Sequence, residues 1–210
     1  MGPQPATSKG AATRDIILER AYMIAASAGL EGLSIGPLAD AVGMSKSGVF
    51  AHFGSREDLQ LAVLDMAATR FGEHTLIPAL GTPRGLPRLR TILANWFEWL
   101  RRDRGGCVLL TAVSEYDDRP GPLRERVVAH HQRWQAELAR AVQLAVETGE
   151  LRADTDASQF AFELNSIALA VQHDAALSDL DAAFSRGRRM FEHLLAYYLP
   201  SPPCPPTQAS

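Results

Sequence analysis

The amino-acid sequence predicts an all-α protein of about nine helices. Three observations support this fold class. Apolar residues recur at intervals of three and four along most of the chain, no segment alternates with the period of two typical of strands, and Gly, Pro and helix-capping residues separate the apolar segments. With 210 residues, the chain is long enough to bury more than one core.

Three short helices are expected first. The apolar face of the first helix comprises Ile17, Ala21, Ile24, Ala25 and Ala28. Gly29 can adopt the left-handed conformation that ends a helix. Ser34 is placed to cap a second helix, whose first turn tolerates Pro37, and Gly43 ends that helix. A third helix is expected between Ser45 and Gly54.

A fourth, longer helix is expected from Arg56 to Ile77, with Ser55 as its cap and Pro78 as its stop. Its apolar face comprises Leu59, Ala62, Val63, Met66 and Phe71. Glu57 and Asp58 lie in its first turn, where carboxylates favour the helix dipole.

Five amphipathic helices are expected after residue 78. Their apolar faces comprise Leu89, Ile92, Leu93, Trp96 and Leu100; the run from Cys107 to Tyr116; Val127, His131, Trp134, Leu138 and Val142; Phe160, Leu164, Ile167, Ala168 and Val171; and Phe184, Phe191, Leu194 and Tyr198. Asp156 with Gln159, and Ser178 with Asp181, have the spacing of capping boxes for the last two helices.

Composition restricts the class of protein. The formal net charge is −3, so the overall charge does not indicate a nucleic-acid binder, and two cysteines do not make a disulfide framework. The longest apolar run is too short to span a bilayer, and no apolar export segment follows Met1. We therefore expect a cytoplasmic protein.

The segment VGMSKSGVFAHFGS, residues 42–55, has the composition of a DNA-reading helix. Ala39 allows a close helix crossing, Gly43 provides the turn, and Val49 and Phe53 can anchor the following helix. The remaining face is polar and small, and comprises Ser45, Lys46, Ser47, Gly48, Phe50 and His52. Small residues let a helix enter the major groove, and a helix N-terminus can meet a phosphate. The same pattern also occurs in plain connecting helices, so the pattern alone leaves both readings open.

The stretch LSIGPLADAVGMSKSGVFAHFGSREDLQLAVL closely resembles the N-terminal domain of the tetracycline-repressor (TetR) family of transcriptional regulators, and GGCVLLTAVSEYDDRPGPLRERV resembles the C-terminal domain of one subgroup. By position, the resemblance implies DNA contacts from Ser34, Ser45, Lys46, Ser47, Gly48, Phe50, His52 and Arg56. The chain departs from the family pattern at Phe50, where Tyr is usual, and at Gly48, where a hydroxyl residue is common.

The resemblance also implies a helical ligand-binding and dimerisation domain. Candidate pocket residues are Trp96, Phe97, Trp99, Cys107, Leu110, Val113, Tyr116, Trp134, Phe162, Asn165 and His173. Apolar walls with a few polar groups suit a small apolar or amphipathic effector, although aromatic residues at helical spacing are more often core. Cys107 is likewise more often a small buried apolar residue than an oxidation sensor.

The expected domains are a flexible arm at 1–10, a helix-turn-helix domain at 11–55, a connecting helix at 56–78, a ligand-binding and dimerisation domain at 79–199 and a disordered Pro-rich tail at 200–210. The expected function is a DNA-binding transcriptional regulator, a repressor that a small organic effector releases from a palindromic operator. The alternatives are a helical protein-interaction module and an all-α enzyme without DNA binding. No catalytic residue, cofactor or metal is expected, because no catalytic or metal-binding motif occurs.

We further expect a homodimer through the last two long helices. The small residues expected to let the two subunits approach are Ala157, Ala161, Ala168, Ala175, Ala176 and Gly187, and Leu164 and Phe191 are expected to be buried between subunits. The fourth helix, which joins the DNA-reading end to the second domain, is expected to act as a lever between effector and DNA.

Overall fold

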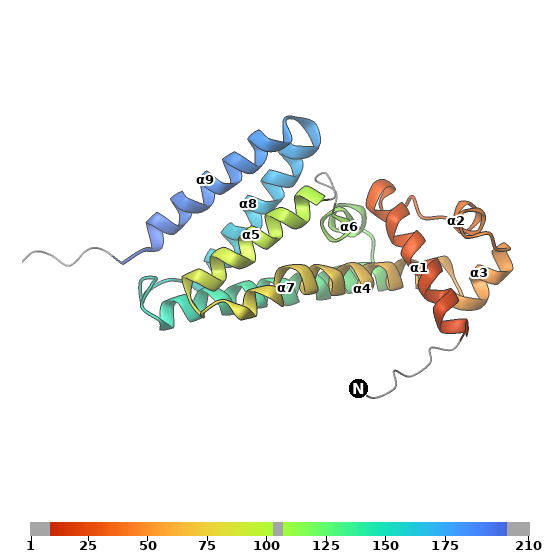
Figure 1. The fold of residues 1–210 in the computed structure, drawn as a ribbon, viewed down its shortest axis with the longest axis horizontal. Helices are drawn as coiled ribbons and strands as arrows, with labels where there is room; N and C mark the ends of the chain where they lie inside the picture. The colour runs from red at the N-terminus through yellow and green to blue at the C-terminus, as the bar shows by residue number, and fades with distance from the viewer. Residues whose placement is uncertain (1–8, 103–106, 201–210) are drawn as a thin grey trace, which may run out of the picture. The chain divides into compact units, whose positions relative to one another are not determined.

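The computed structural model describes residues 9–102 and 107–200, and these residues contain nine α-helices, one short 3-10 helix and no strand (Figure 1). The helices are α1 (Lys9–Ala28), α2 (Ile35–Val42), α3 (Lys46–Phe53), α4 (Arg56–Thr75), η1 (Pro78–Gly81), α5 (Leu86–Arg102), α6 (Val108–Tyr116), α7 (Pro122–Glu147), α8 (Ala157–Leu177) and α9 (Leu180–Tyr198). The predicted all-α class is confirmed. The predictions for most of the N-terminal arm and for the tail fall outside the described residues.

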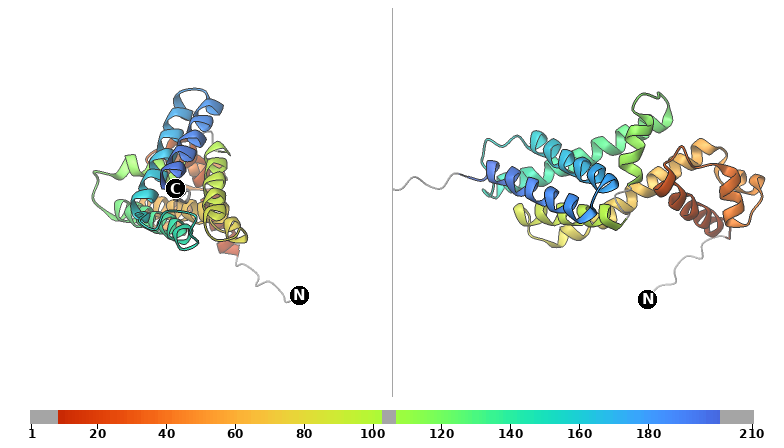
Figure 2. Two further views of the ribbon diagram at one scale, coloured as in Figure 1. Left: turned by 90° about the vertical axis from the view of Figure 1, so that its left-hand side faces the viewer. Right: turned by 90° about the horizontal axis from the view of Figure 1, so that it is seen from above.

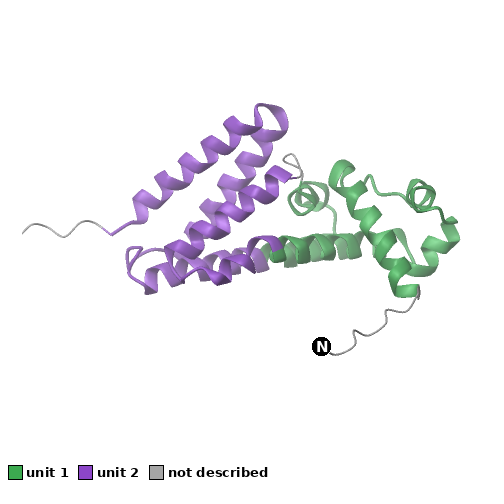
Figure 3. Cartoon of the chain, viewed as in Figure 1, with its two compact units in different colours: residues 1–73, 106–132 green, residues 74–105, 133–210 purple. Residues whose placement is uncertain are grey.

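The chain forms two compact units (Figure 3). Unit 1 comprises residues 1–73 and 106–132, and unit 2 comprises residues 74–105 and 133–210. Helices α4 and α7 are continuous, and each supplies one part to unit 1 and another to unit 2. Unit 1 therefore combines the first helices with α6 and the start of α7, which come from much later in the sequence.

One apolar core holds unit 1 together. Helix α1 contributes Ile17 and Ala21, which are fully buried, and α3 contributes Val49, also fully buried. Helices α6 and α7 add Ala112 and Leu123 to the same core. Because α6 is buried on this core, its position is fixed by the packing of the N-terminal helices.

Most of the predicted helix ends are observed. Gly29 and Gly43 have φ of 74° and 68°, the left-handed conformation that ends α1 and α2. Ser55 Oγ accepts a hydrogen bond from Asp58 N at 3.0 Å and donates one to Asp58 Oδ2 at 2.6 Å, which caps α4. Helix α4 ends at Thr75, two residues before the predicted end, so its 20 residues span about 30 Å.

Two predicted caps differ in the structure. Ser34 occupies the N-cap position of α2, but its side chain accepts no capping hydrogen bond. Ser178 does not begin α9: its hydroxyl donates to Asp174 O at the end of α8, and Asp179 caps α9 by accepting from Ala182 N at 2.6 Å. The predicted Ser178–Asp181 box was therefore wrong by one residue, because the neighbouring carboxylate caps the helix through the N–H of Ala182 instead of that of Asp181.

In unit 2, α8 and α9 lie side by side (Figures 1 and 2). Gly187 of α9 packs so closely on α8 that a Cβ there would lie 2.3 Å from Cγ2 of Val171. Ala161, Ala168 and Ala175 are also buried within the single chain. Gly187 therefore lets α9 approach α8 in one subunit, and none of these four small residues is exposed on the single chain as the predicted subunit interface requires.

The predicted apolar residues of the same interface are also buried within the chain. Leu164 is 1% exposed and Phe191 is 4% exposed. A burial pattern in a sequence does not say whether the covering helix belongs to the same chain.

None of the described helices is both long and apolar enough to cross a membrane.

Candidate nucleic-acid interface

Helices α2 and α3 form the predicted helix-turn-helix. The N–H of Gly43 donates to Asp40 O at 3.2 Å, and the N–H of Met44 donates to Ala39 O at 2.9 Å, so the turn satisfies the last carbonyls of α2. Ala39, Val49 and Phe53 are 1%, 0% and 6% exposed, which places all three in the contact that fixes α3 on the core. The side of α3 opposite this anchor is therefore held outward.

The outward side of α3 carries most of the predicted contact residues. Ser45, Lys46, Ser47 and Phe50 are exposed, and Phe50 has 43% of its surface accessible although it is a large aromatic residue. Helix packing does not require an exposed aromatic here, whereas contact with a deoxyribose-phosphate strand would cover it. Gly48 and His52 are half-buried at the edges of this face.

The start of α3 is held by its own cap. Ser45 Oγ accepts from Gly48 N at 3.1 Å and lies 3.1 Å from Ser47 Oγ. A Cβ on Gly48 would lie 3.3 Å from Ser45 Oγ and 3.2 Å from Cε of Met44. The hydroxyl residue that is common at this position in the family would therefore press on the cap, which gives a physical reason for glycine.

Lys46 lies over the start of α2. A Cβ built on Gly36 would be 3.3 Å from Lys46 Cε and 3.6 Å from its Nζ. Gly36 thus provides the space in which the lysine stem lies, and the ammonium group is held beside the N-terminal part of α2. Gly36 also leaves this position of α2 without a side chain that could reach a base.

Arg56 is engaged within the protein. Its Nε donates to Leu33 O at 2.8 Å, and its Nη2 donates to Glu31 O at 2.6 Å, so it ties the start of α4 to the turn before α2. Two N–H groups on Nη1 are left for another acceptor. Ser34, the other predicted contact outside α3, is exposed beside this turn.

Helix α6 contacts the turn between α1 and α2 through a carboxylate that the sequence analysis did not single out. Glu115 Oε2 accepts from Leu30 N at 2.9 Å, and Glu115 Oε1 accepts from Glu31 N at 3.3 Å. A Cβ on Gly29 would lie 2.0 Å from Glu115 Oε1, so glycine at this position is needed for the carboxylate to reach the backbone. This contact joins residues 85 apart in sequence, and no local pattern indicates it.

The neighbouring tyrosine completes the contact. Tyr116 Oη donates to Glu31 Oε1 at 2.6 Å and accepts from Gln60 Nε2 at 3.3 Å, while Gln60 also donates to Leu30 O at 2.6 Å. The Tyr116 hydrogen bond is the largest cause that lowers the pKa of Glu31, with Arg56 and Arg119 adding to it. Burial and the nearby Glu31 carboxylate raise the pKa of Tyr116, so the phenol stays protonated and remains a donor.

A second polar cluster joins α4 to α7 inside unit 1. Asp65 accepts from Arg126, and His130 Nε2 lies 2.9 Å from Asp65 Oδ1. Burial acts to raise the pKa of Asp65, but the hydrogen bonds from Arg126 and His130 outweigh it, and the pKa is lowered. Asp65 is therefore ionised near neutral pH and holds the two helices together.

The predicted pocket residues are divided between the two units. Cys107, Leu110, Val113 and Tyr116 belong to unit 1, while Trp96, Trp99, Trp134, Phe162, Asn165 and His173 belong to unit 2. Tyr116 is engaged in the α1–α2 contact described above. On the surface of α8, Phe162 is 61% exposed and His173 is also exposed, so these two do not line an interior pocket of the single chain.

Three of the predicted residues are buried or in ring contact inside unit 2. Trp96 and Trp134 meet edge to face with their ring centroids 4.8 Å apart. Asn165 is 6% exposed and has no hydrogen-bond partner among the described residues. The Asn165 amide atoms are not among the fully buried polar atoms without a partner, so burial alone does not mark this side chain as a ligand contact.

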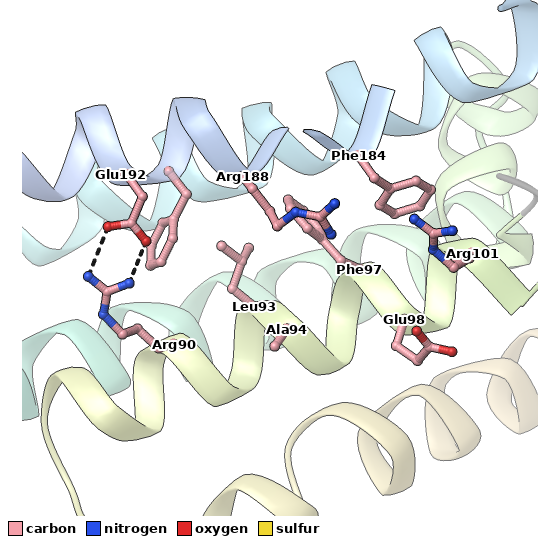
Figure 4. A pocket seen from close by; sticks show the side chains of 10 residues that line it. Arg90, Leu93, Ala94, Phe97, Glu98, Arg101, Phe184, Arg188 and Glu192 are labelled. Carbon is pink, nitrogen blue, oxygen red and sulfur yellow. Dashed lines mark hydrogen bonds and ion pairs between the residues drawn. The ribbon is translucent and has the colours of Figure 1, made fainter. Parts of the chain in front are cut away.

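A groove that the sequence did not predict lies between α5 and α9 of unit 2. Its volume is about 260 Å³. Of the predicted pocket residues only Phe97 lies in it; the full lining comprises Arg90, Leu93, Ala94, Phe97, Glu98, Arg101, Phe184, Arg188, Phe191 and Glu192 (Figure 4).

Two family models match the chain. Residues 17–63 match the family described as bacterial regulatory proteins, tetR family, and residues 85–191 match the tetracyclin repressor-like C-terminal domain. The comparison with curated proteins gave no match.

Solved structures share the fold. A TetR transcriptional regulator from Chloroflexus aurantiacus J-10-FL is 28% identical, with 90% of this chain and 95% of that chain covered and a TM-score of 0.79. A TetR-family regulator from Cytophaga hutchinsonii is 21% identical, with 93% and 99% covered and a TM-score of 0.81. AibR in complex with isovaleryl coenzyme A and operator DNA is 21% identical, with 90% and 98% covered and a TM-score of 0.67. Since the C-terminal model alone matches more than half of the residues, the chain belongs to the TetR family of transcriptional regulators.

Proposed function

We propose that this regulator represses transcription by binding a palindromic operator as a homodimer, with α3 in the major groove, and that a small organic effector releases it. The observation that carries the proposal is the outward face of α3, where Lys46 and the exposed Phe50 flank small residues. Bulkier side chains there would hold the helix backbone away from the base edges.

Four of the eight predicted contact residues are proposed to act as follows. Ser47 and the N-terminus of α3 meet a phosphate, and Lys46 reaches a phosphate or a base edge. Phe50 packs against the sugar-phosphate strand without the phosphate hydrogen bond that a tyrosine would make. His52 contacts a phosphate, so its loss weakens the binding of all DNA sequences by the same factor.

The dimer is proposed to form through exposed apolar residues of α8 and α9. Phe162, Leu169 and Leu177 are 61%, 44% and 75% exposed on α8, and Met190 and Tyr197 are 46% and 68% exposed on α9. Phe162 and Leu169 are seven residues apart, as are Met190 and Tyr197, so each pair lies on one side of its helix. Two such helix pairs from two subunits would bury these residues in a four-helix interface.

The effector is proposed to bind inside unit 2, against Trp96 and Trp134, with Asn165 as a polar contact. Thr75 adds a fully buried hydroxyl with no hydrogen-bond partner among the described residues. Unpaired buried polar groups between aromatic helices suit an amphipathic ligand. The neighbour AibR is in complex with isovaleryl coenzyme A and operator DNA, so a protein of this fold has a site for a small organic ligand, which supports an effector site in this chain.

Two helices are proposed to couple effector and DNA. Helix α4 runs from Arg56, which holds the turn before α2, to Thr75 in unit 2. Helix α6 is hydrogen-bonded to the same turn through the side chains of Glu115 and Tyr116. A few degrees of rotation at these helices would misplace the two recognition helices, which must match half-sites about one DNA turn, roughly 34–36 Å, apart. By linkage, DNA weakens effector binding as much as the effector weakens DNA binding, by about 1–3 kcal/mol.

Selection of bound sequences from a random duplex library tests the function. The proposal expects one palindromic consensus with two half-sites, bound by two chains. A protein-interaction module or an enzyme without DNA binding would give no enriched sequence. Enrichment of a single unrepeated half-site would contradict the dimer but leave α3 as the reading helix.

A further inference from the structure

We propose that the groove between α5 and α9 is a binding site for a small amphipathic carboxylate, separate from the effector site proposed above. The ligand would have a single aromatic ring or a short alkyl chain joined to one carboxylate. This proposal goes beyond DNA binding and release, because it concerns a second site of unit 2.

The bottom of the groove is apolar. Leu93 and Phe97 of α5 face Phe184 and Phe191 of α9, and Phe97 and Phe184 meet with ring centroids 5.7 Å apart and nearly perpendicular planes. Ala94, a small residue, lies at the opening. A ring or short chain placed on these side chains would remove apolar surface from water.

The rim carries three arginines, two of which are paired with carboxylates. Arg90 binds Glu192 through both of its terminal nitrogens at one end of the groove, and Arg101 donates to Asp181 Oδ1 at 2.6 Å. Their guanidinium groups also lie over Phe191 and Phe184, with centroid distances of 5.6 and 4.8 Å. These arginines are therefore held in place before a ligand arrives.

Arg188 is different, because its guanidinium group has no carboxylate partner among the described residues. Figure 4 shows it directed along the groove toward Arg101, above Phe97 and away from Glu192. Two like-charged groups that converge over aromatic rings repel each other, and a carboxylate between them removes the repulsion and accepts charge-assisted hydrogen bonds. Asp181 is 80% exposed, so its pair with Arg101 is weak enough to be shared with a ligand.

The charge count alone does not favour an anion. The three arginines of the rim face Glu98, Glu192 and the adjacent Asp181, and the formal charges cancel. The arrangement of the charges does favour an anion, because Glu192 is occupied by Arg90 and Glu98 lies on the opposite rim from Arg188 (Figure 4). The volume of about 260 Å³ is below the roughly 300–1,000 Å³ of sites for drug-sized ligands, so the occupant has to be small.

Phenylacetate is the probe, with acetate as a charge-only control and 2-phenylethanol as a ring-only control. Calorimetric titration of the full chain should show phenylacetate binding at least tenfold more tightly than either control. Arg188→Gln should weaken phenylacetate binding by about tenfold or more, equivalent to about 1.4 kcal/mol. Ala94→Leu, which fills the opening with a good helix former, should also weaken it.

Arg189→Gln is the matched control, because Arg189 is the next exposed arginine of α9 and its side chain donates to Ser185 Oγ outside the groove lining. This variant should bind phenylacetate like the wild type. Equal affinity for phenylacetate in the wild type, Arg188→Gln and Ala94→Leu would overturn the site. The absence of binding at a phenylacetate concentration of about 10 mM would also overturn it. Acetate binding as tightly as phenylacetate would overturn the role of the apolar floor. DNA affinity, measured without ligand, tests the proposed function independently of all these results.

Discussion

Removing one oxygen atom from Tyr116 tests whether α6 holds the DNA-binding helices. Tyr116 is 4% exposed, and its hydroxyl donates to Glu31 Oε1 at 2.6 Å and accepts from Gln60 at 3.3 Å. Tyr116→Phe removes both hydrogen bonds while it keeps the ring in the core. Gln60 retains its bond to Leu30 O, so the loss falls mainly on the Glu31 carboxylate.

The expected loss follows from the partner's charge and exposure. A hydrogen bond to a charged group contributes about 1.5–3 kcal/mol. Glu31 is 41% exposed and keeps ion pairs with Arg56 at 3.4 Å and Arg119 at 3.3 Å, so solvent and these partners reduce the loss. We expect the free energy of unfolding to fall by about 1–2 kcal/mol at pH 7, or roughly 2–8 °C in melting temperature.

The pH dependence makes the test specific. The Tyr116 hydrogen bond is the largest cause of the lowered pKa of Glu31, whose ordinary value is 4.5. A lowered carboxyl pKa stabilises the folded state above the ordinary value, and this stability is lost as the pH falls through the folded pKa. The difference between wild type and Tyr116→Phe should therefore be full at pH 7 and smaller at about pH 3.5.

Urea unfolding at both pH values and at one fixed protein concentration measures this difference. Tyr116→Phe in a Glu31→Gln background is the control, because without the Glu31 carboxylate the loss should be small at both pH values. A loss of equal size at both pH values would show that Tyr116 stabilises through packing alone. No loss at pH 7 would refute the contact as an anchor of the α1–α2 turn.

Three further changes test other parts of the account. Gly187→Ala should destabilise the protein by about 1–3 kcal/mol in thermal unfolding, because its Cβ would lie 2.3 Å from Cγ2 of Val171, and an unchanged melting temperature would contradict the close α8–α9 packing. Gly36→Ala should weaken operator binding without loss of stability, because the new methyl displaces the Lys46 stem at 3.3 Å, and unchanged affinity would show that the stem position is unimportant. Phe162→Glu should shift light scattering from about twice the 22.8 kDa chain mass toward that mass, and an intact dimer would place the interface elsewhere.

Local features of the fold were predictable from the sequence. Gly29 and Gly43 ended helices where predicted, since only glycine adopts their positive φ without strain. Ser45 capped α3, and the anchor pair Val49 and Phe53 is buried as the helical spacing indicated. These features depend on residues within one or two helical turns, so a sequence pattern is sufficient to find them.

Features that depend on distant residues were not predictable. In the sequence, Glu115 does not differ from an ordinary surface carboxylate. Only the folded chain shows that its side chain accepts a hydrogen bond from the backbone N–H of Leu30. The burial of Gly187 in its own chain, rather than against a partner, depends on which helix comes to lie beside α9. The groove beside Arg188 is formed by helices about 90 residues apart, and neither helix shows it alone.

The central claim is that α3 reads DNA, and the affinity of the Lys46→Ala variant for the selected operator tests it most directly. Arg189→Ala, which loses the same charge from α9, is the matched control. We expect Lys46→Ala to weaken operator binding about tenfold or more, and to make the salt dependence of binding shallower if the lysine contacts a phosphate. The thermal stability of Lys46→Ala and the operator affinity of the control should stay at wild-type values. Wild-type operator affinity in Lys46→Ala would contradict the assignment of α3 as the DNA-reading helix.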